Sequence, residues 1–132
     1  MPEPVTPAER GLLEQAYAAF NARDLDRLLA ALDPAVAWAN GMEGGHVHGR
    51  AGARAYWTRQ WAQVDPHVEP LAMARDTEGR VVIEVHQVVH ELTGKLLLDR
   101  TVRHAYTFRG GLIARMDILP EAEGSGPAGA FP

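Results

Sequence analysis

A single α+β domain, with helices first and an antiparallel sheet after them, is the fold class that the 132-residue sequence predicts. Apolar residues at helical spacing are concentrated before residue 65, whereas β-branched runs separated by turns fill residues 67–119. Residues 120–132 are rich in Pro, Gly and Ala and follow neither pattern. We therefore expect one domain over residues 1–119 and a disordered C-terminal tail over residues 120–132.

The first two helices are predicted from their start signals. Thr6 and Glu9 form a capping box, and Pro7 occupies the first helical position. Apolar residues then recur at helical spacing, namely Leu12, Leu13, Ala16, Tyr17 and Phe20. Asp24 caps a short second helix, which Asp33-Pro34 ends.

The later elements follow in order along the chain. A short strand at residues 36–40 and a Gly-rich loop at 41–49 precede a third helix at about 50–64. Strands are predicted at residues 67–75, 80–91, 96–109 and 112–119, with turn residues between them. Together they form a curved antiparallel sheet.

Composition excludes several classes of function. The net charge is −4 without a basic run, so neither nucleic acid nor an anionic membrane is an expected partner. Cysteine is absent, which excludes disulfides, thiol catalysis and cysteine-based zinc sites. The first ten residues lack the features of a signal peptide, and no apolar run has membrane length. A cytoplasmic protein without a cofactor is expected.

The stretch VVIEVHQVVHEL, residues 81–92, carries the most unusual pattern. Glu84, His86 and His90 fall on alternate positions and would share one face of a strand. A zinc helix is excluded because Gln87 stands where that motif needs Glu and because the many valines disfavour a helix. In a strand, four residues span about 13 Å, too far for one metal.

A second histidine pair, His46-Val47-His48, lies in the Gly-rich loop with Glu43 as the nearest carboxylate. A loop at a pocket mouth is the expected role of this pair, and no metal site is predicted there.

Four segments together resemble a known superfamily. They are the helices within Ala16–Pro34, the strand AVAWAN, the HGR that opens the third helix, and DRTVRHAYTFRGGLIARMDI. In order and spacing, over about residues 8–119, the chain resembles SnoaL-like and ketosteroid-isomerase-like proteins of the nuclear transport factor 2-like superfamily. The resemblance implies a cone: a strongly bent sheet around three helices, with a mostly apolar pocket and dimerisation through the sheet. The family includes isomerases, cyclases, dehydratases and non-catalytic proteins, so the fold does not fix the function.

The resemblance does not carry over the isomerase chemistry. The catalytic Asp of ketosteroid isomerase falls on Asn40, which cannot act as a base. Its oxyanion Tyr falls on Ala16, and the adjacent Tyr17 points about 100° away on the helix. Its oxyanion Asp falls on His104.

The register of the long hairpin determines which face is inside. A three-residue loop, Leu92-Thr93-Gly94, pairs Glu91 with Lys95, His86 with Arg100 and Glu84 with Val102. One face then carries Glu84, His86, Val88, Arg100, Val102 and His104, and the resemblance places it inside the cone. Against this, the opposite face with Val81, Ile83, Val85 and Val89 is more apolar and would be buried in a simple sheet. The alternative therefore leaves the histidine face in water. A two-residue turn at Thr93-Gly94 would sort the apolar residues more cleanly in this way, although it requires a positive φ at the β-branched Thr93.

Two groups of candidate site residues follow. His104 and His86 would be acid and base, oriented by Glu84 and Arg100, with Asn40 nearby. The pocket walls would be Tyr17, Phe20, Trp38, Trp57, Val88, Val102, Tyr106, Met116 and Ile118. The expected ligand is a small, apolar, oxygen-bearing molecule.

Three functions remain open for this pocket. It could belong to an isomerase-, cyclase- or hydratase-type enzyme, to a ligand carrier, or to a dimerisation module filled by its own side chains. An interior collapsed around Trp38 and Trp57 would favour the third.

Overall fold

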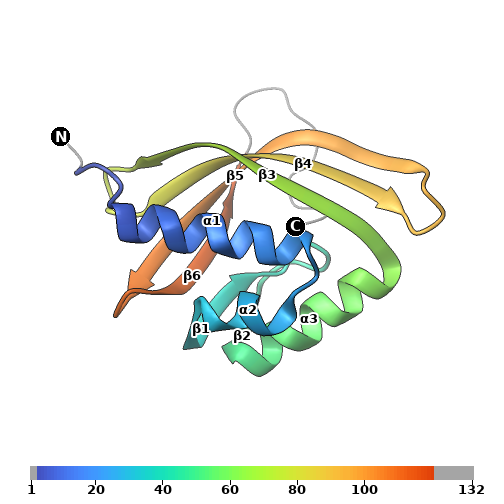
Figure 1. Cartoon of the computed structure of the whole chain (residues 1–132), viewed down its shortest axis with the longest axis horizontal. Coiled ribbons are helices and arrows are strands. Elements are labelled where there is room, and N and C mark those ends of the chain that lie inside the picture. Colours follow the sequence, from blue (N-terminus) through green and yellow to red (C-terminus); the bar gives the residue numbers. More distant parts are fainter. Residues whose placement is uncertain (1–2, 121–132) are drawn as a thin grey trace.

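The computed structural model describes residues 3–120, which form three helices and six strands. The helices are α1 (Pro7–Asn21), α2 (Leu25–Ala30) and α3 (Gly49–Gln63). The strands are β1 (Leu32–Ala39), β2 (His46–His48), β3 (Val64–Arg75), β4 (Val81–Glu91), β5 (Leu96–Arg109) and β6 (Leu112–Leu119) (Figure 1). Apart from Pro120, the predicted tail lies outside the described residues.

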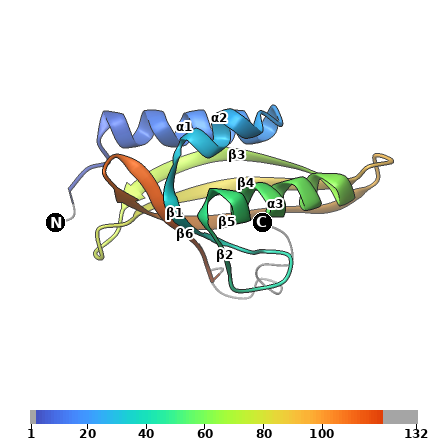
Figure 2. The same ribbon diagram turned by 90° about the horizontal axis from the view of Figure 1, so that it is seen from below.

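The strands form one sheet in the order β2-β1-β6-β5-β4-β3. β1 runs parallel to β6, and the other neighbouring pairs in the described chain are antiparallel. The sheet curls around the helices, with α1 along β3 and α3 beside β1 (Figures 1 and 2). The predicted α+β fold is confirmed, with a mixed rather than a wholly antiparallel sheet. No helix in the described part of the chain is both long and apolar enough to cross a membrane.

The helix starts agree with the sequence signals. The Thr6 N–H donates to Glu9 Oε1 at 2.9 Å and the Glu9 N–H donates to Thr6 Oγ1 at 3.1 Å, so the capping box is present. Asp24 Oδ1 accepts from the Arg27 N–H at 3.2 Å at the start of α2. α3 begins directly after β2, at Gly49.

The first two strands differ from the prediction. β1 begins at Leu32, and its register with β6 shifts between Leu32 and Ala37, which leaves Pro34 unpaired in the ladder. β2 lies inside the predicted loop, where Val47 pairs with Trp38 of β1. A three-residue strand among glycines carries no periodic signal, so the sequence pattern could not reveal it.

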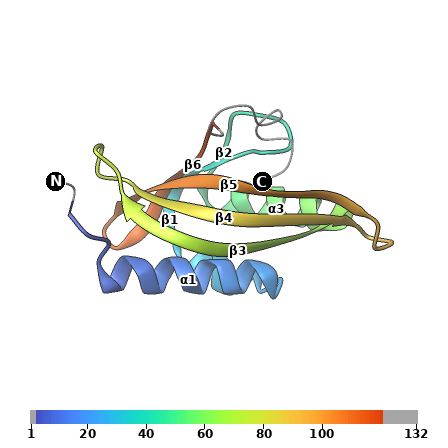
Figure 3. The ribbon, with the colours of Figure 1, turned by 90° about the horizontal axis from the view of Figure 1, so that it is seen from above.

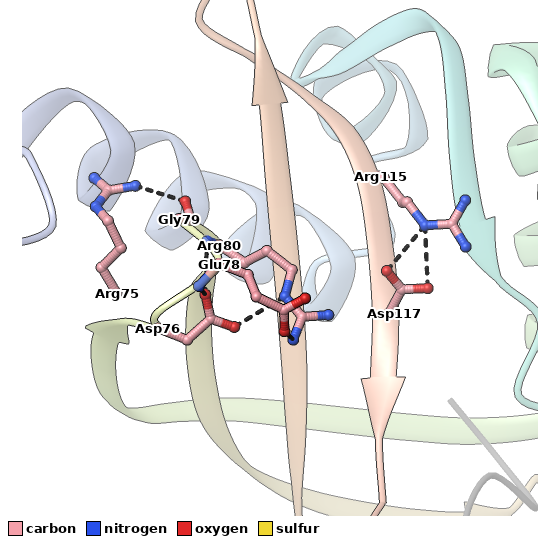
Figure 4. A network of polar contacts seen from close by, with 7 residues as sticks. All are labelled: Arg75, Asp76, Glu78, Gly79, Arg80, Arg115 and Asp117. Atoms are coloured by element: carbon pink, nitrogen blue, oxygen red, sulfur yellow. Dashed lines mark hydrogen bonds and ion pairs between the residues drawn. The ribbon is translucent and has the colours of Figure 1, made fainter. Parts of the chain in front are cut away.

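Asp76 organises the turn between β3 and β4 (Figure 4). Its Oδ1 accepts from the N–H groups of Glu78 and Arg80 at 3.0 and 2.9 Å, and its Oδ2 accepts from Arg80 Nε at 2.9 Å. Arg75, the last residue of β3, forms an ion pair with Glu9 in the first turn of α1. The edge of the sheet is thereby tied to the N-terminal helix.

The hairpin between β4 and β5 begins with the predicted loop. The Glu91 N–H donates to the Lys95 carbonyl at 2.7 Å, and the Gly94 N–H donates to the Glu91 carbonyl at 2.8 Å. Gly94 has a φ of +104°, which L-residues rarely adopt. The loop Leu92-Thr93-Gly94 is confirmed.

A β-bulge at Leu97 then shifts the register by one residue. His90 lies opposite Leu96 and Val89 lies opposite Leu98, so Leu97 has no partner on β4. Figure 3 shows β3, β4 and β5 side by side, with this hairpin projecting at one end.

The predicted cross-strand pairs beyond the bulge are wrong. His86 lies opposite Thr101 instead of Arg100, and Glu84 is displaced from Val102 in the same way. Because side chains alternate along a strand, a shift of one residue brings the other face of β4 to the concave side. The buried apolar positions there are Val81, Ile83, Val85 and Val89 on β4 and Val102 and Tyr106 on β5.

Two glycine substitutions test the geometry of the hairpin loop. Gly94→Ala adds a Cβ in open space at φ +104°, so we expect the free energy of unfolding to fall by about 1–2 kcal/mol. Gly11→Ala, also in open space but within α1, is the matched control. It should raise the free energy by about 0.5–1 kcal/mol because alanine is the better helix former. Urea unfolding measures both, and a neutral or stabilising Gly94→Ala would contradict the loop geometry.

Candidate functional site

A cavity lies between the helices and the concave face of the sheet, in the described part of the chain. Its lining is Ala16, Tyr17 and Phe20 of α1, Leu28 of α2, Trp57 of α3, Trp38 of β1, Val68 of β3, His104 and Tyr106 of β5, and Met116 of β6. The volume is about 30 Å³, enough for one or two water molecules. The lining is mostly apolar and aromatic.

A buried hydrogen-bonded cluster forms the polar part of this lining. The Tyr17 hydroxyl lies 2.9 Å from His104 Nδ1 and 2.8 Å from the Tyr106 hydroxyl. The Tyr17 and His104 rings are stacked, with centroids 6.2 Å apart. One residue of α1 therefore joins two residues that alternate along the concave face of β5.

Counting donors and acceptors places the protons of the cluster. If Tyr106 donates to Tyr17 and Tyr17 donates to His104 Nδ1, both hydroxyl protons have acceptors and His104 is protonated at Nε2. The reverse order leaves two polar groups without partners among the described residues, the Tyr106 proton and the lone pair of His104 Nε2, whereas the first order leaves the Nε2–H alone. Because each unpaired buried polar group is costly, the first order is favoured. His104 Nε2–H is then a hydrogen-bond donor.

All three groups of the cluster are uncharged at neutral pH. Burial, with a smaller contribution from the charge of Arg100, lowers the pKa of His104 to about 4. Burial raises the pKa of the Tyr106 hydroxyl, and burial together with Tyr106 raises the pKa of Tyr17 well above its usual value. The cluster therefore offers neutral hydrogen bonds to a ligand.

Three aromatic ring nitrogens around the cavity have no hydrogen-bond partner in the described structure. They are His104 Nε2, Trp38 Nε1 and Trp57 Nε1. Indole N–H groups only donate, and the tautomer argued above makes His104 Nε2 a donor as well. Buried polar groups are normally paired, so a shared cavity with three unpaired donors indicates a place for acceptor atoms.

The aromatic side chains also fill much of the interior. Trp38 and Trp57 meet edge to face with centroids 5.0 Å apart, and Phe20 lies 6.5 Å from Trp57. Trp38 packs against Tyr106 at 6.0 Å. This packing explains why the cavity is small.

Most of the predicted wall residues line the cavity. They are Tyr17, Phe20, Trp38, Trp57, Tyr106 and Met116, and the predicted catalytic residue His104 lies with them. Val102 is buried in the core and Ile118 is packed against it, but neither lines the cavity.

Glu84, His86 and Val88 do not reach the cavity, contrary to the predicted face of β4. They lie on the outer face because of the bulge at Leu97. The His86 side chain is 40% exposed and its Nε2 lies 2.7 Å from Asp99 Oδ1.

Asn40 has a structural role in the turn between β1 and β2. Its Oδ1 accepts from the N–H groups of Met42 and Glu43 at 3.0 and 2.9 Å, and its Nδ2 donates to Glu43 Oε1 at 3.1 Å. It does not line the cavity.

Arg100 lies on the concave face, as predicted, but with a different neighbour. Its Nε donates to Oε1 of Gln87, the fully buried residue opposite it on β4, at 3.2 Å. Gln87 was not predicted as a site residue, because it lies on the opposite face of β4 from His86.

Three lining residues were not among the predicted walls: Ala16, Leu28 and Val68. Ala16 stands at the aligned oxyanion position and Leu28 on the apolar face of α2, so both had a signal. Val68 follows the alternation of burial along β3, which a pattern broken by Pro66 and Pro70 concealed.

His46 is paired with a carboxylate on β6. Its Nε2 lies 2.9 Å from Asp117 Oδ1, and Arg115 Nε donates to both oxygens of Asp117 (Figure 4 shows the arginine contacts). Burial opposes ionisation of Asp117, but the hydrogen bonds from Arg115 and His46 lower its pKa below the usual value. No group of three metal-ligating side chains occurs among residues 3–120.

Removing the shared hydroxyl should cost more than removing the terminal one. Tyr17→Phe leaves both His104 Nδ1 and the Tyr106 hydroxyl without partners, so we expect a loss of about 2–4 kcal/mol in the free energy of unfolding. Tyr106→Phe leaves the Tyr17–His104 bond intact and should cost about 1 kcal/mol. Chemical unfolding of both variants measures this order, and the opposite order would contradict the bridging role of the Tyr17 hydroxyl.

The buried His104 should make folding sensitive to acid. Its pKa is about 4 when folded and about 6.5 when unfolded, so between these values the unfolded chain binds more protons. The contribution of the neutral His104 to the free energy of unfolding is therefore fully present above pH 6.5. It falls by roughly 3 kcal/mol as the pH decreases to 4. NMR titration of the His104 ring, with His104→Phe as the control in unfolding experiments, measures the pKa and this contribution. A ring that titrates near 6.5 would contradict its burial.

Comparison with known proteins places the chain in a family. Residues 13–116 match the model of the SnoaL-like domain. No curated protein sequence matches the chain significantly.

Solved structures share the fold. TerC, crystallised with polyporic acid, is 24% identical, with a TM-score of 0.75 over 88% of this chain and 92% of TerC. An NTF2-like protein of unknown function from Burkholderia pseudomallei is 24% identical, with a TM-score of 0.76 and the same coverage, 88% and 92%. A candidate polyketide cyclase from Xanthomonas campestris is 27% identical, with a TM-score of 0.69 over 83% of this chain and 87% of the other. Because the matched segment covers about four-fifths of the 132-residue chain, the chain belongs to the SnoaL-like domain family.

Proposed function

We propose that this SnoaL-like domain binds a small, mostly apolar molecule that presents an oxygen acceptor to the cavity. The observation that carries the proposal is the buried Tyr17–His104–Tyr106 cluster in an aromatic lining, with His104 Nε2 unpaired among the described residues. Aromatic walls with a few oriented polar groups are typical of small-molecule sites. A carbonyl or quinone oxygen is the acceptor that fits a neutral N–H donor.

The ligand requires the aromatic walls to move. A volume of about 30 Å³ holds a carbonyl group but not an aromatic ring. Phe20 and Trp38 are each 7% exposed, whereas Trp57 is fully buried. The first two are the side chains that can yield to a ligand without opening the centre of the core.

Known relatives support a ligand of this kind. TerC was crystallised with polyporic acid, and several structures of this fold belong to candidate polyketide cyclases. Oxygen-bearing aromatic compounds are therefore the first class to test with this chain.

Hydrogen-bond donation is the chemistry that the cluster supports best. A histidine with a pKa of about 4 is a weak base at neutral pH, and an asparagine occupies the aligned position of the isomerase base. His104 would instead stabilise negative charge that develops on a bound carbonyl oxygen. Because the cluster supplies only a weak base, the proposed function is binding.

The second candidate is a module filled by its own side chains, and one observation favours it. Trp38 and Trp57 pack against each other at 5.0 Å across the interior. In that case no ligand would stabilise the domain.

Two expectations from the sequence stay predictions. One is the association of two chains through the outer face of the sheet, which carries Val88, and the other is a cytoplasmic location.

Three probes of one shape test ligand binding. Acetophenone carries a carbonyl oxygen, which only accepts, 1-phenylethanol carries a hydroxyl, which accepts and donates, and ethylbenzene carries neither group. We expect acetophenone to bind about 3- to 10-fold more tightly than ethylbenzene, the contribution of one hydrogen bond. Thermal shift and tryptophan fluorescence measure the affinities.

Two histidine variants provide the control. His104→Phe removes the donor in the cavity and should abolish the preference for the ketone, whereas His86→Phe changes the outer face and should retain it. Equal affinity of the wild type for all three probes would exclude the donor role. Absence of binding by every probe would favour the self-filled module.

A further inference from the structure

The backbone has a positive φ at Arg23, where α1 ends. The value is +59°, and the other residues with a positive φ in the described part of the chain are glycines. The Asp24 N–H donates to the Ala19 carbonyl at 2.9 Å, the hydrogen bond of a helix end that closes on a left-handed residue. Glycine is the usual residue there, because a Cβ disfavours the left-handed region. A strained arginine in its place indicates a role for the side chain.

The Arg23 side chain joins the end of α1 to the start of β3. Its Nη1 donates to the Phe20 carbonyl at 3.0 Å. Its Nη2 donates to the Pro66 carbonyl at 2.7 Å and to Asp65 Oδ1 at 2.5 Å. The Arg23 side chain is 30% exposed, so groups from two elements hold the guanidinium in one place near the surface.

The guanidinium also lies over two aromatic rings. Its central carbon is 5.5 Å from the centre of the Phe20 ring and 5.2 Å from the centre of the Trp61 ring. The two rings meet edge to face with centroids 5.5 Å apart. Phe20 lines the cavity and Trp61 does not. The Phe20 ring therefore contacts both the cavity and a partly exposed guanidinium.

The surroundings of Phe20 leave its side chain as the movable part of this wall. Asn21 holds α1 to β3, because its Nδ2 donates to the Val68 carbonyl at 2.7 Å and its Oδ1 accepts from the Val68 N–H at 3.0 Å. Trp57, which also contacts the Phe20 ring, is fully buried. A ligand that enters here must displace the Phe20 ring and with it the contact with Arg23.

We propose that Arg23 is a latch that holds Phe20 in a closed position, and that a ligand enters the cavity between Phe20 and Trp61 by opening this stack. The inference rests on the proposed function, because a cavity of about 30 Å³ must enlarge before it admits a ring. The free energy needed to open the stack lowers the apparent affinity, since only the open fraction of the protein binds. Arg23 therefore keeps the empty cavity closed and weakens ligand binding.

Three variants test the latch. Arg23→Gly removes the guanidinium and suits the positive φ, so we expect it to fold. Asp65→Asn removes the charged partner alone. Arg59→Ala is the matched control, because the Arg59 guanidinium pairs with Glu43 at 2.7 Å and lies 5.9 Å from the centre of the Tyr56 ring. Tyr56 does not line the cavity.

The affinity and the association rate of acetophenone are the measurements with ligand. Arg23→Gly should bind acetophenone about 10-fold more tightly than the wild type, through faster association, because the stacking contacts no longer oppose opening. Asp65→Asn should gain only about 2-fold, since an exposed ion pair contributes little. Arg59→Ala should behave as the wild type. Stopped-flow tryptophan fluorescence measures the rates, and a residue that only supports the fold would change stability without changing them.

The motion of Phe20 tests the latch without ligand. In protein with ¹³C-labelled phenylalanine, NMR line shapes report how fast the Phe20 ring flips. The flips should be several-fold faster in Arg23→Gly and unchanged in Arg59→Ala. Equal flip rates in the wild type and Arg23→Gly would overturn the latch whether or not a ligand binds.

The possible failures are distinct. Equal affinity and association rate in the wild type and Arg23→Gly, with acetophenone bound by both, would overturn the latch but leave the proposed function intact. Binding by Arg23→Gly alone would support the latch. Absence of acetophenone binding by both proteins would overturn the proposed function and this inference with it.

Discussion

The bulge at Leu97 determines which side chains of the long hairpin face the helices. Without it, the loop at Gly94 would bring His86 and Glu84 to the concave side and turn Ile83 and Val85 to the outside. The buried face of β4 has four β-branched residues, whereas the outer face has two, Val82 and Val88. The choice of face therefore changes the hydrophobic free energy by roughly 3–6 kcal/mol, at roughly 1.5–3 kcal/mol for each fully buried side chain. The contact between Gln87 and Arg100 depends on this choice of register.

A small polar cluster inside an apolar cone is tolerated only when its members satisfy one another. Tyr17 contributes the hydroxyl that bridges His104 and Tyr106, and it comes from a helix that packs across the sheet. The cluster therefore also fixes how α1 is docked on β5. Burial keeps all three groups neutral, and His104 Nε2 is the ring nitrogen of the cluster that has no partner among the described residues.

Two neighbouring parts of the concave face differ in electrostatic character. At His104 the environment is neutral and offers donors without charge, whereas the next row of the sheet carries a guanidinium held by an amide. A charged group at the centre of the cone would be strongly penalised by desolvation, but the hairpin end is only partly buried at Arg100. The position of the charge along β5 thus follows the gradient of burial.

Local sequence determined the elements and many of their ends. The capping box at Thr6, the helical spacing from Leu13 to Phe20 and the Gly94 loop are local signals, and each is present in the structure. Six of the nine predicted wall residues and His104 line the cavity. Most of the six are aromatic, and large aromatic side chains are buried in the interior of a small domain. The resemblance to the SnoaL-like family predicted the strongly bent sheet around the helices, which periodicity alone does not predict.

The sequence marked the Val81, Ile83, Val85 and Val89 face of β4 as the more apolar one, but only the tertiary structure decided between the two faces and set the neighbours of the polar residues. A one-residue bulge leaves no trace in the alternation of either strand, since each strand is internally regular and only their relative register changes. For the same reason Gln87, and not His86, is the buried residue of β4 that lies opposite Arg100. The contact of Tyr17 with His104 joins residues 87 positions apart, and no local pattern encodes a distance set by the packing of a helix on a curved sheet.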